Sequence, residues 1–184
     1  MRIFATTIIL LIFFNFCYSQ IVVINEILSL NNNTILDDFG ERSDWIELYN
    51  TSEETVDLGS WYLSDDENNV LKWIFPDTSI FPHGFILIFC SGRDTLSGYL
   101  HSSFKLKSSG EPVFLSDAYH NLVDYFLPVS LENDVSYGRK TDGSPEYAYF
   151  FKTSPGATNS NNLLLNEISF SSNEGFYETN IQLT

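Results

Sequence analysis

Carboxylates supply most of the chemistry that this sequence offers. The chain has 24 acidic and 9 basic residues and a formal net charge of −15. Two turns carry oxygen ligands of the kind that calcium prefers, one at Asp65, Asp66 and Glu67 and the other at Asp37 and Asp38. Neither turn has the alternate-position spacing and the closing glutamate of a dedicated calcium loop. We therefore predict two solvated turns and no cofactor, with a calcium site at one of the turns as the alternative.

Three other charged residues stand next to apolar neighbours, where a charge needs a partner. Glu26 and Glu47 each interrupt an apolar run, and Arg139 ends a Ser-Tyr-Gly-Arg sequence. An arginine and a carboxylate can form a pair of directional hydrogen bonds, which would fix how two strands meet. We predict that Glu26 or Glu47 pairs with Arg139. The alternative is that all three charges are solvated at strand rims.

The sequence lacks a recognisable set of catalytic or zinc-binding residues. His83, His101 and His120 are scattered, and none has a second ligand at helical or hairpin spacing. Serines are abundant, but there is no Gly-x-Ser-x-Gly elbow and no glycine-rich phosphate loop. We therefore predict that the chain has no catalytic site of its own.

The elements that must position the charged residues are short strands. In the extended stretch that ends at a Thr-Ser-Glu-Glu turn, Trp45, Glu47 and Tyr49 share one face, while Ile46 and Leu48 share the other. A strand with an aromatic residue and an acid on one face is typical of the border of a sandwich core, with the acid turned toward a partner or the rim.

Frequent Gly, Pro, Asn and Asp turns divide the rest of the chain into similar short segments, and no stretch shows a helical stripe. Further strands are expected at residues 21–27, 71–75, 85–90, 113–115, 122–127, 136–139 and 147–151. The uniformly apolar segment 85–90 is predicted to be a central strand covered on both faces, and 113–115 and 122–127 a hairpin. The pattern predicts an all-β fold, an immunoglobulin-like antiparallel β-sandwich. Its tryptophans and phenylalanines should lie between the two layers, with the carboxylates outside.

The first 19 residues have the pattern of a signal peptide. Arg2 precedes an apolar run, and Cys17-Tyr18-Ser19 offers small residues before a cleavage site at Gln20. Cleavage would leave Cys90 as the only cysteine, in an apolar strand where an inert core residue is expected. We predict a secreted or cell-surface protein, with an uncleaved membrane anchor as the alternative.

Residues 20–159 are expected to form one domain, followed by a second, incomplete module at 160–184. Ser160 to Asn162 reads as a linker, and Leu163-Leu164-Leu165-Asn166-Glu167-Ile168 then repeats the pattern of Ile24-Asn25-Glu26-Ile27. The remainder has room for about two strands, which are not a stable unit alone. The chain is therefore expected to be part of a longer exported protein, or a truncated gene product.

An ordered set of motifs resembles the lamin tail domain family, an immunoglobulin-like fold of nuclear lamins and of exported bacterial proteins. The matching pieces are Ile24–Ile27, Asp44–Asn50, Val56–Leu58, Trp61–Asp65, Gly110-Glu111, Val123-Asp124, Ser136–Arg139, Asp142-Gly143, Ser154–Ala157 and Asn159. They span residues 21 to 159. The resemblance is to the exported bacterial type, because no heptads and no rod accompany them.

The last residues, from Phe170 to Thr184, resemble the opening of the small β-module found at the C-termini of chitobiase and β-hexosaminidase. In bacterial proteins that module follows lamin tail domains and accompanies a spore-coat-protein-H-like kinase domain. The resemblance implies that a further domain could follow Thr184.

The function expected from these features is that of a non-catalytic interaction or spacer module in a multidomain exported protein. Its partners would be neighbouring domains, an extracellular protein or a polysaccharide on which Tyr62, Tyr125 and Tyr147 could stack. The acidic charge disfavours nucleic acid, and no membrane contact is expected after signal cleavage. Two alternatives stay open: the accessory N-terminal domain of an exported hydrolase or kinase, and a calcium-dependent adhesion module.

Overall fold

The computed structural model describes residues 20–96 and 98–159, and the predicted signal peptide and second module lie outside them. The strands are β1 (Val22–Leu28), β2 (Trp45–Asn50), β3 (Val56–Asp57), β4 (Tyr62–Ser64), β5 (Trp73–Ile74), β6 (Ser79–Ile80), β7 (Phe85–Phe89), β8 (Thr95–Leu96), β9 (Leu100–His101), β10 (Val113–Ser116), β11 (Leu122–Phe126), β12 (Ser136–Arg139) and β13 (Tyr147–Phe150). Across these ranges no helix has the length and apolar character needed to cross a membrane.

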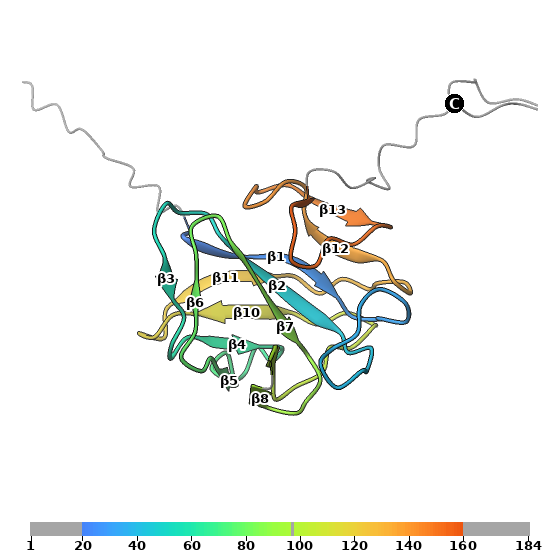
Figure 1. The fold of residues 1–184 in the computed structure, drawn as a ribbon, viewed down its shortest axis with the longest axis horizontal. Coiled ribbons are helices and arrows are strands. Elements are labelled where there is room, and N and C mark those ends of the chain that lie inside the picture. The colour runs from blue at the N-terminus through green and yellow to red at the C-terminus, as the bar shows by residue number, and fades with distance from the viewer. Residues whose placement is uncertain (1–19, 97, 160–184) are drawn as a thin grey trace, which may run out of the picture.

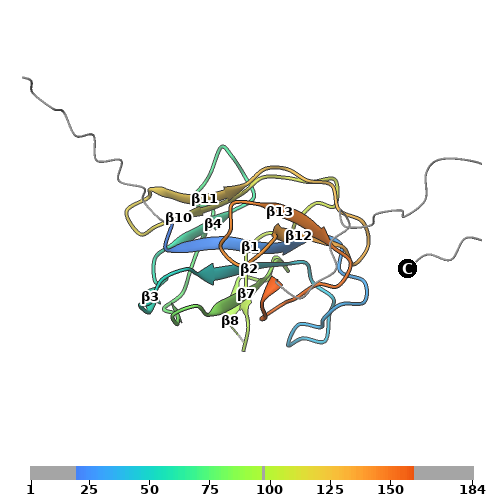
Figure 2. The ribbon, with the colours of Figure 1, turned by 90° about the horizontal axis from the view of Figure 1, so that it is seen from above.

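The strands form two main sheets that face each other, as the all-β prediction requires. The larger sheet has the order β13-β12-β1-β2-β7-β9-β8, and the smaller one has the order β11-β10-β4-β5. A two-stranded ladder of β3 and β6 adds to them. Figure 2 shows the layer of β4, β10 and β11 on one side and the layer of β1, β2 and β7 on the other. The immunoglobulin-like sandwich is therefore confirmed. One pair, β7 with β9, is parallel rather than antiparallel.

β1 and β2 lie at the centre of the larger sheet and carry both predicted glutamates (Figure 1). Their register places Ile24 opposite Leu48 and Glu26 opposite Glu47, with a bulge between Ile24 and Glu26. A bulge sets two residues of one strand against one of the other, so Asn25 has no partner in the register. The bulge brings Asn25 and Glu26 together beside Glu47.

The core between the sheets follows from the alternation of side chains along the strands. Ile24, Ile46 and Ile88 of the larger sheet pack against Leu63 and Leu115 of the smaller one, and all five are fully buried. Trp61 and Trp73 belong to the same cluster. Their burial confirms the prediction for these two tryptophans.

The outer face of the larger sheet holds a second, smaller cluster that the sequence did not predict. Trp45 packs there with Leu28 and Phe89, under Ile35. Trp45 lies on the face opposite Ile46 because side chains alternate along β2. The expectation that all tryptophans lie between the sheets is therefore wrong for Trp45, which is nevertheless fully buried.

β7 is an interior strand of the larger sheet, but it is not covered on both faces along its whole length. Ile88 and Phe89 pair with β9 and are buried, whereas Phe85, Ile86 and Leu87 are only half-buried. β9 pairs only with Ile88 and Phe89 of β7, so among the described strands the first half of β7 also lacks a neighbour on that side of the sheet. The prediction of full cover therefore holds only for the second half of the strand.

Candidate functional site

Arg139 forms the buried ion pair that was predicted, but with a different partner. Its Nη2 donates to Oδ2 of Asp124 at 2.8 Å, and Nε donates to the carbonyl oxygen of Ile24 at 2.9 Å. Oδ2 of Asp124 also accepts from the amide of Ile24 at 2.8 Å. The pair therefore ties β11 and β12 to the same residue of β1.

The predicted pairing of Arg139 with Glu26 or Glu47 is wrong, and the register explains why. Glu26 is the cross-strand partner of Gly138, so its side chain lies on the face that Gly138 occupies. Arg139 is the next residue along β12 and points to the opposite face. Glu47 shares the face of Glu26 because it is its direct partner on β2. Both glutamates are therefore separated from the guanidinium by the sheet itself.

Glu26 is fully buried and is satisfied by hydroxyl and amide groups instead of a cation. The hydroxyl of Ser136 donates to Oε1, and the hydroxyl of Ser154 donates to Oε2 at 2.7 Å. The amide of Ser154 also donates to this carboxyl group. Burial raises the pKa of Glu26, and the hydrogen bonds from Ser136 and Ser154 offset part of that rise.

Glu47 is equally buried and has fewer donors. The Nδ2 group of Asn25 donates to Oε1 at 3.1 Å, and the amide of Gly156 donates to Oε2 at 2.6 Å. Burial raises the pKa of Glu47 to about 8, and the negative charges of Glu26 and Asp142 add to the rise. Glu47 is therefore largely protonated at neutral pH, which removes most of the repulsion expected between two facing carboxylates.

Asp142 and Asn159 complete this arrangement, which we call the carboxylate cluster: Asn25, Glu26, Glu47, Asp142, Ser154 and Asn159. Oδ1 of Asp142 accepts from Nδ2 of Asn25 at 3.0 Å and from the amide of Asn159 at 3.0 Å. Nδ2 of Asn159 donates to the carbonyl oxygen of Arg139 at 2.7 Å. The cluster fastens residues 154–159 across β1, β2 and β12, and its oxygens are occupied by protein donors. Its role is structural, and the expectation that the carboxylates lie outside is wrong for Glu26, Glu47 and Asp124.

The predicted acidic turns bind protein groups, and Asp37 is buried, so the expectation of a solvated turn is wrong at that residue. Asp65 forms an ion pair with Lys72 at 2.6 Å, and Asp66 accepts from the amide of Asn68. Asp37 accepts from three groups of its own loop, the amides of Phe39 and Glu41 and the hydroxyl of Ser43, and it also pairs with Arg93. In residues 20–96 and 98–159, no three acidic, histidine or cysteine side chains lie together so that they could hold a metal ion. Glu67 is exposed beside Asp66.

His101 is not isolated, contrary to the sequence analysis, but lies between a serine and an aspartate. Its Nε2 is 2.6 Å from Oδ1 of Asp38, and its Nδ1 is 2.9 Å from Oγ of Ser91. The hydrogen bond with His101 lowers the pKa of Asp38. This order of groups is that of a hydrolase triad.

The buried position of Ser91 makes this triad a poor nucleophilic site. Ser91 is 8% exposed, and its Oγ already accepts from the amide of Arg93. Ser91 lines none of the grooves described below. The three residues instead join the loop at Asp38 to β9 and the end of β7. Cys90, the neighbour of Ser91, is a free, buried thiol whose pKa burial raises, as expected for an inert core cysteine.

Several open grooves lie on the described part of the chain. One of about 630 Å³ lies beside β7 and β9, and another of about 540 Å³ lies at the mouth of the sandwich, between β11 and the pair β12–β13. We call the latter the tyrosine groove. Its lining residues are Gln20, Asp124, Tyr125, Phe126, Leu127, Pro128, Val129, Tyr137, Arg139, Pro145 and Tyr147. In the larger sheet, β12 and β13 lie beyond β1 at one edge, and β11 is an edge strand of the smaller sheet. An aromatic surface is therefore left at the sandwich edge.

The aromatic rings of this surface pack against one another. Tyr137 and Tyr147 are stacked with centroids 5.7 Å apart, and Phe126 meets Tyr147 edge to face at 5.0 Å. The guanidinium of Arg139 lies over the ring of Tyr147 at 5.2 Å. Mutual packing restricts the rings to one arrangement, which makes them a preformed contact surface. Tyr149 extends the row by packing against Tyr137 at 4.9 Å.

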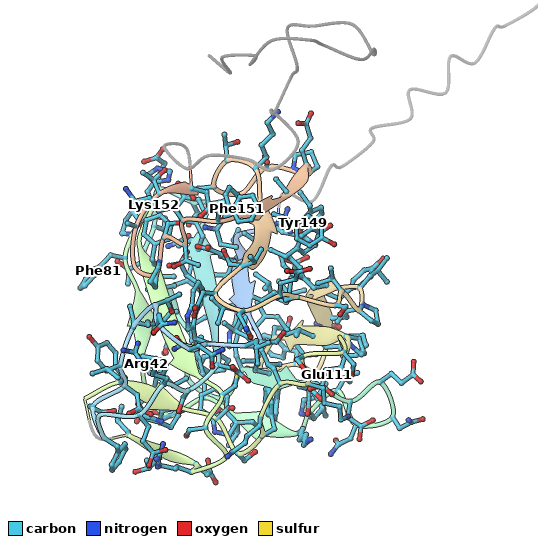
Figure 3. The ribbon with its side chains drawn as sticks, turned by 90° about the vertical axis from the view of Figure 1, so that its right-hand side faces the viewer. Arg42, Phe81, Glu111, Tyr149, Phe151 and Lys152 are labelled. Atoms are coloured by element: carbon cyan, nitrogen blue, oxygen red, sulfur yellow. The ribbon has the colours of Figure 1, made fainter. Side chains whose placement is uncertain are left out.

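A groove of about 430 Å³ adjoins the tyrosine groove, and we call it the acidic groove. It is lined by Asp65, Asp66, Glu67, Asn68, Lys107, Glu111, Pro112, Phe114, Tyr125, Leu127 and Pro128. Tyr125, Leu127 and Pro128 line both grooves and therefore form the wall between them. In Figure 3, Tyr149 of β13 lies near the top of the view, and Glu111, which precedes β10 in the chain, lies lower.

Sequence reasoning identified part of this surface. It singled out Tyr62, Tyr125 and Tyr147 as residues that could stack on a ligand, and the structure places Tyr125 and Tyr147 in the tyrosine groove. Tyr62 instead meets His120 edge to face, away from the lining. Tyr137 was missed, although its place beside Arg139 in the Ser-Tyr-Gly-Arg motif marks the face that it shares with Arg139.

The model of the Lamin Tail Domain family matches residues 19–129 of the chain. No curated protein matches the sequence of this chain. Asn25, Glu26, Glu47 and Asp124 lie within the matched range, whereas their partners Arg139, Asp142, Ser154 and Asn159 lie beyond it. The matched range ends before β12 and β13. The hydrogen bonds of Glu26 and Arg139 join β12 to β1 and β11, and β13 pairs with β12.

Proposed function

Since the chain belongs to the lamin tail domain family, we propose that it is a non-catalytic interaction module of an exported, multidomain protein of the bacterial type. The tyrosine groove is the observation that carries this proposal. It is open, mostly aromatic and apolar, and it has few polar groups, which is typical of a recognition site. The family and its fold alone would not give a function, because one fold carries many functions.

Three features support a non-catalytic role. Glu26 and Glu47, two carboxyl groups whose pKa burial raises, are enclosed in the carboxylate cluster, with protein donors on their oxygens. The serine of the Ser91, His101 and Asp38 triad is buried. The groups inside the tyrosine groove, Asp124 and Arg139, are bound to each other. A catalytic acid or base must reach the substrate, and these groups are either buried or bound to other protein groups.

Export is supported by the sequence pattern of residues 1–19, and the proposed site of cleavage precedes Gln20. Residues 160–184 would then begin the second β-module, and the whole protein would present the sandwich to a neighbouring domain, an extracellular protein or a polysaccharide. N-terminal sequencing of the protein recovered from the exporting cell tests this part of the proposal. A sequence that starts at Gln20 supports it, and one that starts at Met1 contradicts it.

Binding is tested with purified protein on arrays of glycans and extracellular proteins. Tyr125→Ser alters the wall between the two grooves, where Tyr125 is 50% exposed. Tyr119→Ser is the matched control, because Tyr119 is 87% exposed at the turn of the same hairpin and lines neither groove. Binding that is lost with Tyr125→Ser and kept with Tyr119→Ser supports the proposal. Binding that neither variant changes would place recognition on another surface.

The accessory domain of an exported enzyme is a second candidate, because residues 160–184 resemble the start of a module that accompanies kinase domains. The reading frame beyond Thr184 distinguishes it from the first. A calcium-dependent adhesion module is a third candidate, and a calorimetric titration with calcium tests it. Heat released at micromolar calcium, and lost with Asp66→Asn, would favour that function.

A further inference from the structure

The tyrosine groove and the acidic groove form one divided surface. They share Tyr125, Leu127 and Pro128, and both Tyr125 and Leu127 are at least half exposed. A ligand that covers this wall must therefore enter both grooves. An extended chain with side chains pointing in different directions can do so, whereas a flat, rigid ligand would rest on the wall.

The two grooves differ in charge. The acidic groove has Asp65, Asp66, Glu67 and Glu111 against one lysine, Lys107, in its lining. Lys107 is bound to Glu111 at 2.8 Å, and Lys72 outside the lining is bound to Asp65 at 2.6 Å. Asp66 and Glu67 make no ion pair within the part of the chain that the structure describes. In a chain of net charge −15, this groove is complementary to a cationic group.

The tyrosine groove offers ring faces and hydroxyl donors, and its two charged residues, Asp124 and Arg139, are paired with each other. The hydroxyl groups of Tyr125, Tyr137 and Tyr147 make no hydrogen bond to another residue among those described. Burial raises the pKa of Tyr137 and of Tyr147, so both hydroxyls stay protonated and can donate at neutral pH. Pro128 and Pro145 stand beside the rings. Aromatic walls with hydroxyl donors match the polyproline II helix, whose carbonyl groups are free to accept.

We propose that this double groove binds an extended, proline-rich peptide segment that carries arginine or lysine. The proposal rests on the function proposed above and names the partner of the same surface. Proline rings lie against Tyr125, Tyr137 and Tyr147, whose hydroxyl groups donate to backbone carbonyl groups of the peptide. A basic side chain crosses the wall of Tyr125 and Leu127 and meets Asp66 and Glu67. Because the polyproline II helix is already ordered, binding costs little conformational entropy.

The test is calorimetric titration of the whole chain with two synthetic peptides of equal length. One repeats the triplet Pro-Pro-Arg, and the other repeats Pro-Pro-Gln. The arginine peptide should bind more tightly, and added salt should weaken its binding more than that of the glutamine peptide. Equal affinity and equal salt dependence of the two peptides would contradict the role of the acidic groove.

Variants locate the binding surface. Tyr125→Ser should weaken the arginine peptide about tenfold or more, because an exposed aromatic residue at the centre of a contact carries much of its energy. Glu67→Gln should weaken it about twofold and reduce its salt dependence. The matched controls are Tyr119→Ser and Glu54→Gln, which change exposed residues outside both grooves and should leave the affinity unchanged. Loss of affinity in the controls as well would overturn the assignment of the surface.

The same titration with a neutral β-linked oligosaccharide separates this proposal from the function on which it rests. If the oligosaccharide binds, the peptides do not, and Tyr125→Ser abolishes the binding, the groove is an interaction site for a glycan and the peptide proposal is wrong. If neither probe binds and an array shows no ligand that depends on Tyr125, both the peptide proposal and the interaction function of this groove are wrong.

Discussion

Glu26 and Glu47 face each other directly across β1 and β2, and both side chains are fully buried. Like charges in this position would repel each other strongly. The repulsion is avoided because Glu47 has a pKa of about 8 and therefore keeps its proton at neutral pH. Glu26 accepts hydrogen bonds from Ser136 and Ser154. The centre of the larger sheet thus depends on a protonation state.

The first prediction concerns stability and pH. A carboxyl group with a raised pKa in the folded state stabilises the protein fully below its unfolded pKa, near 4.5, and this stabilisation is lost as pH rises. The free energy of unfolding should therefore fall by several kcal/mol between about pH 4.5 and pH 8, at about 1.4 kcal/mol per unit of pKa difference. Burial raises the pKa of Glu26 as well, so its contribution has the same sign. Urea unfolding across this range measures the fall.

Glu47→Gln supplies the control for that measurement. Glutamine cannot ionise, so most of the fall with pH should disappear, while the stability at pH 5 should change by the loss of one hydrogen bond, about 1 kcal/mol. Asp77→Asn is a matched variant, because Asp77 is exposed and lies outside the carboxylate cluster. A pH dependence that Glu47→Gln leaves intact would show that another group is responsible.

The second prediction concerns the ion pair of Arg139. Arg139→Met leaves the carboxylate of Asp124 buried with only the amides of Ile24 and Tyr125 as donors, so the free energy of unfolding should fall by about 3–5 kcal/mol. Arg139→Met combined with Asp124→Asn should cost less than the sum of the two single changes. Chemical denaturation of the four proteins gives the coupling energy, and full additivity would argue against a direct pair.

The third prediction concerns Gly138. A Cβ atom at this position would lie 2.5 Å from the carbonyl oxygen of Asn25 and 2.9 Å from Cα of Glu26. These are backbone atoms at the bulge and cannot move aside without changing the register, so Gly138→Ala should cost about 3 kcal/mol or more. The control is Ala148→Gly, which changes the partner of Gly138 on β13 without adding an atom. Gly156→Ala is less suitable as a control, because Gly156 has a positive φ. A melting temperature unchanged by Gly138→Ala would contradict this packing.

The fourth prediction concerns the extent of the domain. A chain that ends at residue 129 lacks β12, β13 and the residues that satisfy Glu26, so it should not give a cooperative unfolding transition. A chain that ends at residue 159 should give one. Ser154→Ala in the longer chain should lower the free energy of unfolding by about 1–3 kcal/mol, because Glu26 loses a buried donor. A stable, cooperative fold of the shorter chain would show that β12 and β13 are dispensable.

The fifth prediction concerns the triad of Ser91, His101 and Asp38. A fluorophosphonate probe that labels activated serines should not react with the folded protein, because Oγ of Ser91 is buried and accepts from the amide of Arg93. Ser91→Ala should instead destabilise the protein by about 1 kcal/mol. Mass spectrometry detects labelling, and a modified Ser91 that requires His101 would overturn the non-catalytic assignment.

The sequence predicted the fold well because the signals of β-structure are local. Alternation of side chains placed Ile46 and Leu48 together on one face of their strand, which the structure shows to be the core face, and turn residues marked the β10–β11 hairpin. It could not predict the partner of Arg139, because this depends on the register between β1 and β12. It also could not place Trp45, since local alternation does not say which face the second sheet covers.

The surface of the two grooves was predictable only in part. Tyr125 and Tyr147 have side chains that are recognisable in the sequence as aromatic contact residues. The acidic groove, however, brings together residues that are distant in the chain, such as Asp66 and Pro128. The proximity of Ser91 and Asp38 to His101 likewise depends on two loops that meet only in the folded molecule. No spacing along the chain carries that information.

The hydrogen bonds from Ser154 to Glu26 join groups that are 128 positions apart. Contacts of such separation form late, because the intervening chain must first be ordered. During vectorial synthesis, the first strand would therefore emerge with its two polar residues unsatisfied until the last segment had left the ribosome. The nascent domain would stay incompletely folded for nearly its whole length of synthesis, a state in which chaperones can hold a chain.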